Sequence, residues 1–150
     1  MPTQKSRTQP VEEELDSLGL PANRHAELRM VAMPADANPN GDIFGGWTMS
    51  HVDLAGGIAA MRRAHGRVAT IAVNSFVIKQ PVSVGDLVSF YAKVTRTGTT
   101  SVTVDVAVYS QPWADLKRVV KVADAELTYV VIDAQGKKRS VTLPSAADAR

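Results

Sequence analysis

The sequence predicts an α+β fold in which a curved antiparallel sheet wraps around one long central helix. The first observation is a helical stretch at residues 46–65 that carries hardly any charge until Arg62 and is apolar on opposite faces. The second is a period-two alternation of apolar and polar residues in most of the chain after Gly66. Because a helix that is apolar nearly all round must be covered on most sides, we expect the sheet to curl around it.

The expected elements follow in order and are separated by turn-forming residues. A first strand is expected at 25–33, ended by Pro34, and a long loop rich in Pro, Asn, Asp and Gly follows. The central helix ends at Gly66, which is a natural helix terminator. Four further strands are expected at residues 69–80, 87–96, 101–110 and 119–132.

Alternation also predicts which face of each strand is buried. In the strand at 87–96, Val88 and Phe90 belong to the inward face, and Ser89 and Tyr91 belong to the outward face. The short turns between strands are typical of a meandering sheet with one buried face.

The length of the chain predicts one domain. A chain of 150 residues can bury a single core. We expect that domain to span residues 23–144. The polar residues 1–22 are expected to form a mobile tail or a loosely docked turn, and residues 145–150 a second tail.

Composition excludes several classes of function. The formal net charge of +2 is too small to indicate a nucleic-acid partner. No apolar run is long enough to cross a membrane, and the first residues lack the apolar core of a secretory signal, so we expect a cytoplasmic protein without a membrane partner. The chain has no cysteine, which excludes disulfides and thiolate chemistry, and its three histidines lack metal-ligand spacing. No metal is therefore expected.

Asp42 is the first candidate for chemistry because it precedes the expected helix start beside Gly45 and Gly46. Free N–H groups at a helix start can hold a carbonyl oxygen as it becomes negative, and a neighbouring carboxylate can activate water or attack directly. Spacing alone also allows a structural role, in which Asp42 caps the helix or closes an Asn-Gly turn.

Asp53 is the second candidate, since it lies within the apolar helix, where an ionised carboxylate needs a partner, a cavity or a raised pKa. Gly56 and Gly57 follow it, each costing about 1 kcal/mol of helix stability relative to alanine. That cost indicates close approach of another backbone or of a ligand.

Basic residues near the expected ends of the helix and strands could receive phosphate groups. The three that we retain as ligand candidates are Arg67, Lys79 and Arg96. Each of them, taken alone, is more often a solvated charge.

The run Asn-Gly-Asp-Ile-Phe-Gly-Gly-Trp at 40–47, followed by Met-Ser-His-Val-Asp at 49–53, resembles the hot-dog-fold acyl-CoA thioesterases. The likeness is greatest to the YciA-like branch of bacterial acyl-CoA hydrolases. Weaker matches follow in the same order, at residues 65–68, 70–73 and 81–86. The resemblance covers roughly residues 28–143.

This resemblance implies hydrolysis of short- to medium-chain acyl-CoA to a free acid and CoA, without a metal or redox cofactor. It implies that Asp42 is the catalytic carboxylate and that the backbone at Gly45 and Gly46 polarises the thioester carbonyl. Asp53 matches a helix carboxylate that serves the chemistry in sister branches, where the paired groups come from two subunits.

The family's sites lie between protomers, so the resemblance implies a dimer as the smallest functional unit and a trimer of dimers as a common assembly. From the matching loop we add Asn40 and Phe44 as candidate substrate contacts. Two positions depart from the family pattern, which often has an acid at Asn74 and a lysine at Gln80. The nearest lysine, Lys79, would point to the opposite face of a strand.

Two other functions remain as alternatives. The fold could bind acyl-CoA or a nucleotide without catalysis, although the intact loop acid and paired glycines disfavour this. A hydratase or dehydratase would want a histidine opposite an acid, and no histidine lies between Pro34 and Trp47. That alternative ranks last.

Overall fold

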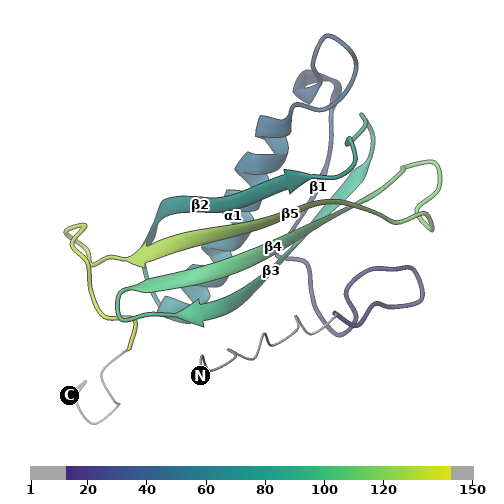
Figure 1. The fold of residues 1–150 in the computed structure, drawn as a ribbon. Helices are drawn as coiled ribbons and strands as arrows, with labels where there is room; N and C mark the ends of the chain where they lie inside the picture. The colour runs from purple at the N-terminus through teal and green to yellow at the C-terminus, as the bar shows by residue number, and fades with distance from the viewer. Residues whose placement is uncertain (1–12, 143–150) are drawn as a thin grey trace, which may run out of the picture.

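A computed structural model describes residues 13–142 as one helix wrapped by a five-stranded antiparallel sheet (Figure 1). The elements in chain order are β1 (Leu28–Val31), the 3-10 helix η1 (Pro34–Asp36), α1 (Gly45–Ala64), β2 (Val68–Ile78), β3 (Leu87–Thr97), β4 (Ser101–Gln111) and β5 (Val120–Val131). The predicted α+β class, with a curved sheet around a central helix, is confirmed. Parts of the expected tails, residues 1–12 and 145–150, lie outside the described residues.

The strands are ordered β1-β3-β4-β5-β2 across the sheet, and every pair is antiparallel. Only β3, β4 and β5 form the expected meander. After α1 the chain enters β2 at the edge beside β5, and residues 79–86 then carry it back to β3. The expectation of a continuous meander was wrong for β2, because alternation identifies strands but does not specify which strands pair.

The core lies between α1 and the concave face of the sheet. The helix contributes small residues, among them Val52, Ala55 and Ala59, and β4 contributes a row of fully buried valines. The inward positions expected for the other strands are also buried; they include Val88, Phe90, Ala123, Ala125, Leu127, Tyr129 and Val131. Small helix residues allow the helix and the sheet to approach closely. The larger strand residues then fill the space between them.

Tyr129 of β5 packs closely against α1 at Gly56. A Cβ atom added at Gly56 would lie 2.4 Å from the Tyr129 hydroxyl oxygen, whereas one added at Gly57 would lie 3.7 Å from the nearest ring carbon. The expectation that another backbone or a ligand approaches these glycines was wrong for Gly56, because a tyrosine side chain occupies that space. Gly56 thus lowers the stability of the helix but leaves room for the Tyr129 hydroxyl group.

The convex face of the sheet is partly buried as well. Leu20 packs against Tyr91 and Tyr109, and Tyr91 is only 2% exposed. The predicted outward direction of Tyr91 is correct, but its predicted exposure was wrong because residues 13–22 cover it. A backbone hydrogen bond from Asp16 to Leu20 and a bridge between Leu15 and Pro21 shape this segment.

One side of the molecule stays apolar and uncovered within the described residues. Strand β2 pairs only with β5 and exposes Ile71, Val73, Val77 and Ile78. On the neighbouring helix, Leu54 and Met61 are also exposed. The helix is therefore less enclosed by its own chain than its sequence predicts. An apolar edge strand of this length is a natural surface for pairing with another strand.

The different surroundings of the two helix glycines predict opposite effects on stability. Gly57→Ala should stabilise the protein by roughly 0.5–1 kcal/mol, because alanine favours the helix and meets only an ordinary contact. Gly56→Ala should destabilise it by roughly 1–2 kcal/mol, because the clash with Tyr129 outweighs the same helix gain. Urea unfolding of both variants at one protein concentration measures the difference. Equal stabilities would contradict the close approach of the Tyr129 hydroxyl.

Candidate active site

The loop before α1 holds Asp42 by its backbone. The side chain of Asn38 accepts hydrogen bonds from the N–H groups of Asn40 at 2.9 Å and Asp42 at 3.1 Å. The Asn38 N–H donates in turn to the carbonyl oxygen of Asp42 at 2.6 Å. Gly41 has a φ of +88°, a left-handed conformation that glycine adopts without strain. The loop is therefore a fixed turn, and the backbone of Asp42 is one of its anchors.

The start of α1 is left without a side-chain cap. Phe44 occupies the N-cap position, makes no side-chain hydrogen bond there, and no acidic residue follows in the first turn. The N–H groups of Gly45 and Gly46 have no acceptor among residues 13–142. Such groups carry the positive end of the helix dipole and readily bind an oxygen with negative charge.

Asp42 is exposed in the loop that leads into this helix start, and its carboxylate forms no hydrogen bond or ion pair with the described part of the chain. The structural alternative was that Asp42 caps the helix or closes the turn. The capping role is contradicted, because Phe44 is the N-cap residue. The turn is closed between Asn38 and the backbone of Asp42, so that role uses the peptide groups of Asp42 and not its carboxylate. No contact of the Asp42 side chain within the described chain therefore accounts for an aspartate at this position.

Asp53 lies farther along α1 and is held by two hydroxyl groups. Thr70 Oγ1 donates to Asp53 Oδ1 at 2.7 Å. The Tyr129 hydroxyl lies 2.8 Å from the backbone oxygen of Asp53 and 3.2 Å from Oδ1. This carboxylate is half-buried at the seam between α1 and the β2 edge. The sequence predicted that the Asp53 carboxylate needs a partner. Among the described residues, its partners are two hydroxyl groups and no cation.

The two acids do not meet within one chain. Asp53 follows the start of α1 by roughly 12 Å along the helix axis, at the usual rise per residue. Asp42 lies beyond that start, in the preceding loop. Within one chain the exposed loop acid and the helix acid are therefore separate groups.

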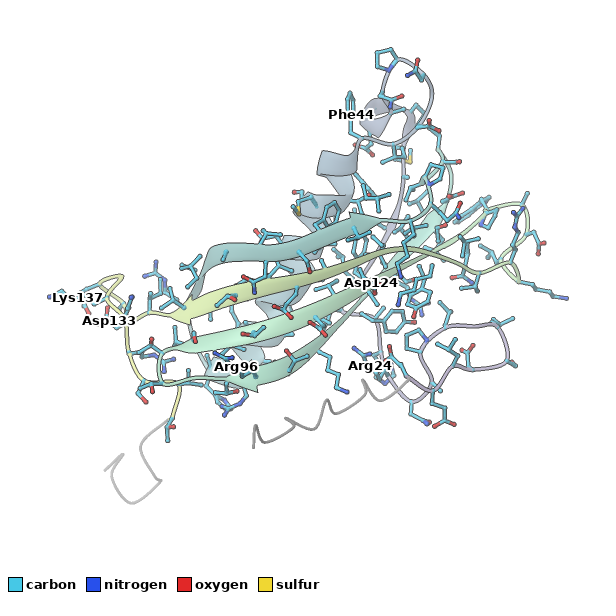
Figure 2. The ribbon with its side chains drawn as sticks, viewed as in Figure 1. Arg24, Phe44, Arg96, Asp124, Asp133 and Lys137 are labelled. Carbon is cyan, nitrogen blue, oxygen red and sulfur yellow. The ribbon has the colours of Figure 1, made fainter. Side chains whose placement is uncertain are left out.

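The three basic candidates are not brought together with Asp42. Lys79 forms an ion pair with Asp124 at 2.7 Å on the convex face of the sheet. Arg67 precedes β2 and donates to the carbonyl oxygen of Ala134 at 3.2 Å. Since β2 runs for roughly 35 Å at the usual strand rise, Arg67 lies at the opposite end of it from Lys79. Figure 2 shows Arg96 at the far end of β3 as well, away from Phe44 at the start of α1.

His51, a half-buried polar residue of α1, has a packing role. His51 Nδ1 lies 2.7 Å from the carbonyl oxygen of Trp47. Its ring stacks on Phe90 with 5.7 Å between centroids, and it lies tilted against Trp47 with 4.4 Å between centroids. Within residues 13–142 no group of three acids or histidines is arranged to hold a metal ion. In the same range, no helix is both long and apolar enough to span a membrane.

Sequence reasoning missed Thr70 and Tyr129, because each is an ordinary strand residue at its own position. Only the pairing of strands could have revealed them, since Thr70 and Tyr129 are partners across β2 and β5. The unexplained pair of Asp53 and Gly56 was the only hint in the sequence that a polar group approaches the helix here.

Comparison with known proteins shows the family of this chain. The family model described as the thioesterase superfamily matches residues 40–114. The acyl-CoA thioester hydrolase YciA of Escherichia coli is 45% identical over 116 residues, covering 76% of this chain and 88% of that protein. The hexameric thioesterase y2039 of Yersinia pestis superposes with a TM-score of 0.75 at 43% identity, covering 83% of this chain and 98% of that one.

A hexameric hotdog fold thioesterase of Campylobacter jejuni gives a TM-score of 0.75 at 40% identity, over 85% of this chain and 93% of its own. These matches include the loop with Asp42, the whole of α1 and most of the sheet. The expected family and fold are confirmed. The chain belongs to the hot-dog-fold thioesterase superfamily, among the acyl-CoA thioester hydrolases related to YciA.

Proposed function

We propose that this enzyme hydrolyses short- to medium-chain acyl-CoA with Asp42 as the catalytic carboxylate and the start of α1 as the oxyanion site. The observation that supports this most is the Asp42 carboxylate, which has no partner in the described chain and belongs to the loop that leads into helix N–H groups without an acceptor. An exposed carboxylate without a partner keeps its lone pairs free to accept a proton or a hydrogen bond.

In the proposed reaction the thioester carbonyl accepts hydrogen bonds from the N–H groups of Gly45 and Gly46. Asp42 either removes a proton from water or attacks the carbonyl carbon itself. A new C–O bond forms, the carbonyl oxygen gains negative charge and the helix start stabilises it. Collapse of this intermediate breaks the C–S bond and releases CoA; in the direct-attack route water then hydrolyses the acyl-enzyme. No group beyond substrate, water and protein is required.

A second copy of the chain completes the proposed site. The relatives from Y. pestis and C. jejuni are hexamers, and the exposed edge of β2 offers an apolar surface for pairing. Antiparallel pairing of two β2 strands brings the start of one beside the end of the other. Thr70, which donates a hydrogen bond to Asp53, lies near the start of β2. At the end of β2, the Cδ1 atom of Ile78 would lie 3.1 Å from a Cβ atom added at Gly45. Each Asp53 would then approach the helix start of its partner, in a dimer that assembles further into a trimer of dimers.

The same pairing suggests how the remaining candidates act. Arg67, at the start of β2, would lie near the end of the partner's β2 strand, where it could bind a CoA phosphate. Phe44 is 52% exposed at the helix start and offers an apolar surface to an acyl chain, and Asn40 offers a polar group in the same loop. Lys79 would need to exchange Asp124 for a phosphate. Arg96 lies at the far end of β3, away from the start of α1, so we assign it only to the outer part of CoA.

We further propose that the enzyme works in the cytoplasm without a cofactor, CoA entering only as part of substrate and product. A chain without cysteine suits a reducing compartment. The non-catalytic alternative is set aside because the curated relatives are named hydrolases.

Replacement of the loop acid tests the mechanism. Asp42→Asn should lower kcat for butyryl- or hexanoyl-CoA by roughly 10²–10⁴-fold, because an amide neither takes a proton nor attacks well. Asp36→Asn is the control: it lies in the same segment and its carboxylate only accepts a hydrogen bond from Met33, which an amide oxygen can also accept. Thiol release is the measurement. An Asp42→Asn enzyme as fast as the wild type would disprove the assignment.

Charge on the edge of β2 tests the need for a partner. Val73→Lys should dissociate the assembly and abolish most turnover together, because a lysine in an apolar strand interface is costly to bury. Leu18→Lys, at a similar exposure of 44% against 42% for Val73, should change neither property. Sedimentation velocity and thiol release are measured on the same samples. A dissociated but fully active Val73→Lys protein would contradict a shared site.

A further inference from the structure

We propose that Ile78 selects among acyl groups by closing one side of the helix start, so that its side chain limits how far an acyl chain extends past Gly45. The inference rests on the proposed function, because it assumes that the thioester carbonyl lies at the start of α1. It gives a role in specificity to a residue that the proposed reaction itself does not use.

Ile78 reaches the helix start from the last position of β2. It lies on the same face of the strand as Phe76, because side chains alternate along a strand, and Phe76 packs against the core beside α1. The Cδ1 atom of Ile78 would lie only 3.1 Å from a Cβ atom added at Gly45. That separation is shorter than an ordinary contact between carbon atoms. The space beside Gly45 is therefore already filled by Ile78.

The space beside Gly46, the next residue of α1, is open. A Cβ atom added there would meet no atom from another part of the described chain within 4 Å. Both glycines provide N–H groups that have no acceptor among residues 13–142. A carbonyl oxygen that binds these N–H groups has room on the Gly46 side, and Ile78 is a wall on the Gly45 side.

The wall is apolar and partly uncovered. Ile78 is 47% exposed, and Phe44, which directly precedes Gly45, is 52% exposed. A thioester of CoA has a hydrocarbon acyl arm and a pantetheine arm with amide groups, which are costly to bury without hydrogen bonds. The acyl arm is therefore the part of the substrate that fits beside Phe44 and Ile78, where burial of its methylene groups is favourable.

The shape of isoleucine makes this wall resistant to displacement. A β-branched side chain is restricted at χ1, so Ile78 does not swing aside readily. A short acyl group fits in front of the wall, whereas a longer one has to bend away from Gly45. Ile78 thus gives a physical reason for a preference for the shorter acyl groups.

Shortening the wall in steps tests the inference. Ile78→Val removes only the Cδ1 atom, and Ile78→Ala removes every atom beyond Cβ. The ratio of kcat/KM for decanoyl-CoA to kcat/KM for butyryl-CoA should rise in that order, by roughly 10-fold or more in Ile78→Ala, as expected when an apolar pocket gains room for methylene groups. Thiol release from both substrates measures the ratio.

Val77→Ala is the matched control. Val77 lies next to Ile78 on the same edge strand and is 54% exposed, but its side chain points to the opposite face of β2. Its replacement should leave the ratio unchanged. Sedimentation velocity on every variant records the assembly, and Ile78→Val decides the case if Ile78→Ala dissociates.

Gly46→Ala tests the open side. The added methyl group takes the space in which the carbonyl would lie, so kcat/KM should fall for both substrates alike. The free energy of unfolding, measured in urea, should stay at least that of the wild type, because alanine favours a helix and meets no neighbour here.

An unchanged ratio in assembled Ile78→Val and Ile78→Ala enzymes would overturn the inference, and so would full activity in Gly46→Ala. Neither result bears on Asp42 as the catalytic carboxylate. A fully active Asp42→Asn enzyme would instead refute the proposed function.

Discussion

The proposed site and the packing of α1 both depend on a helix start that has no side-chain cap. The side chain of Phe44 makes no hydrogen bond at the N-cap, no acid follows in the first turn, and the side chain of Asn38 completes the turn before it. The helix dipole is therefore uncompensated at the point where Asp42 is exposed. Because an uncapped start costs roughly 1 kcal/mol, the rest of the fold must hold α1 in place by packing.

That packing explains why the interior of α1 is built from small residues. The sheet covers one side of the helix closely, with Tyr129 reaching over Gly56. The other side, with Leu54 and Met61, stays exposed next to the apolar edge of β2. The same arrangement that buries the core thus leaves apolar side chains exposed along α1 and the β2 edge. Stability and the proposed shared site follow from one placement of the helix.

Much of the fold and of the candidate site could be predicted from the sequence, because the patterns that indicate them are local. The uncharged helix, the alternating strands and the loop from Asn40 to Gly46 each carry their pattern within a few residues. The pairing of β2 with β5 could not be predicted, since alternation fixes only the face that a strand buries. Burial of Tyr91 was missed because its cover, Leu20, lies far away in the sequence. The hydroxyl pair on Asp53 was missed for the same reason.

Each proposed site combines the loop acid of one subunit with the helix acid of another, and mixing two variant chains in one assembly tests this arrangement. Asp42→Asn and Asp53→Asn chains, each inactive alone, are co-refolded and assayed for thiol release. A mixed dimer then has one site with both acids altered and one with both intact. Random mixing should restore about a quarter of wild-type turnover, as expected for a two-fold symmetric pair. No recovery from verified mixed assemblies would contradict a site shared between subunits.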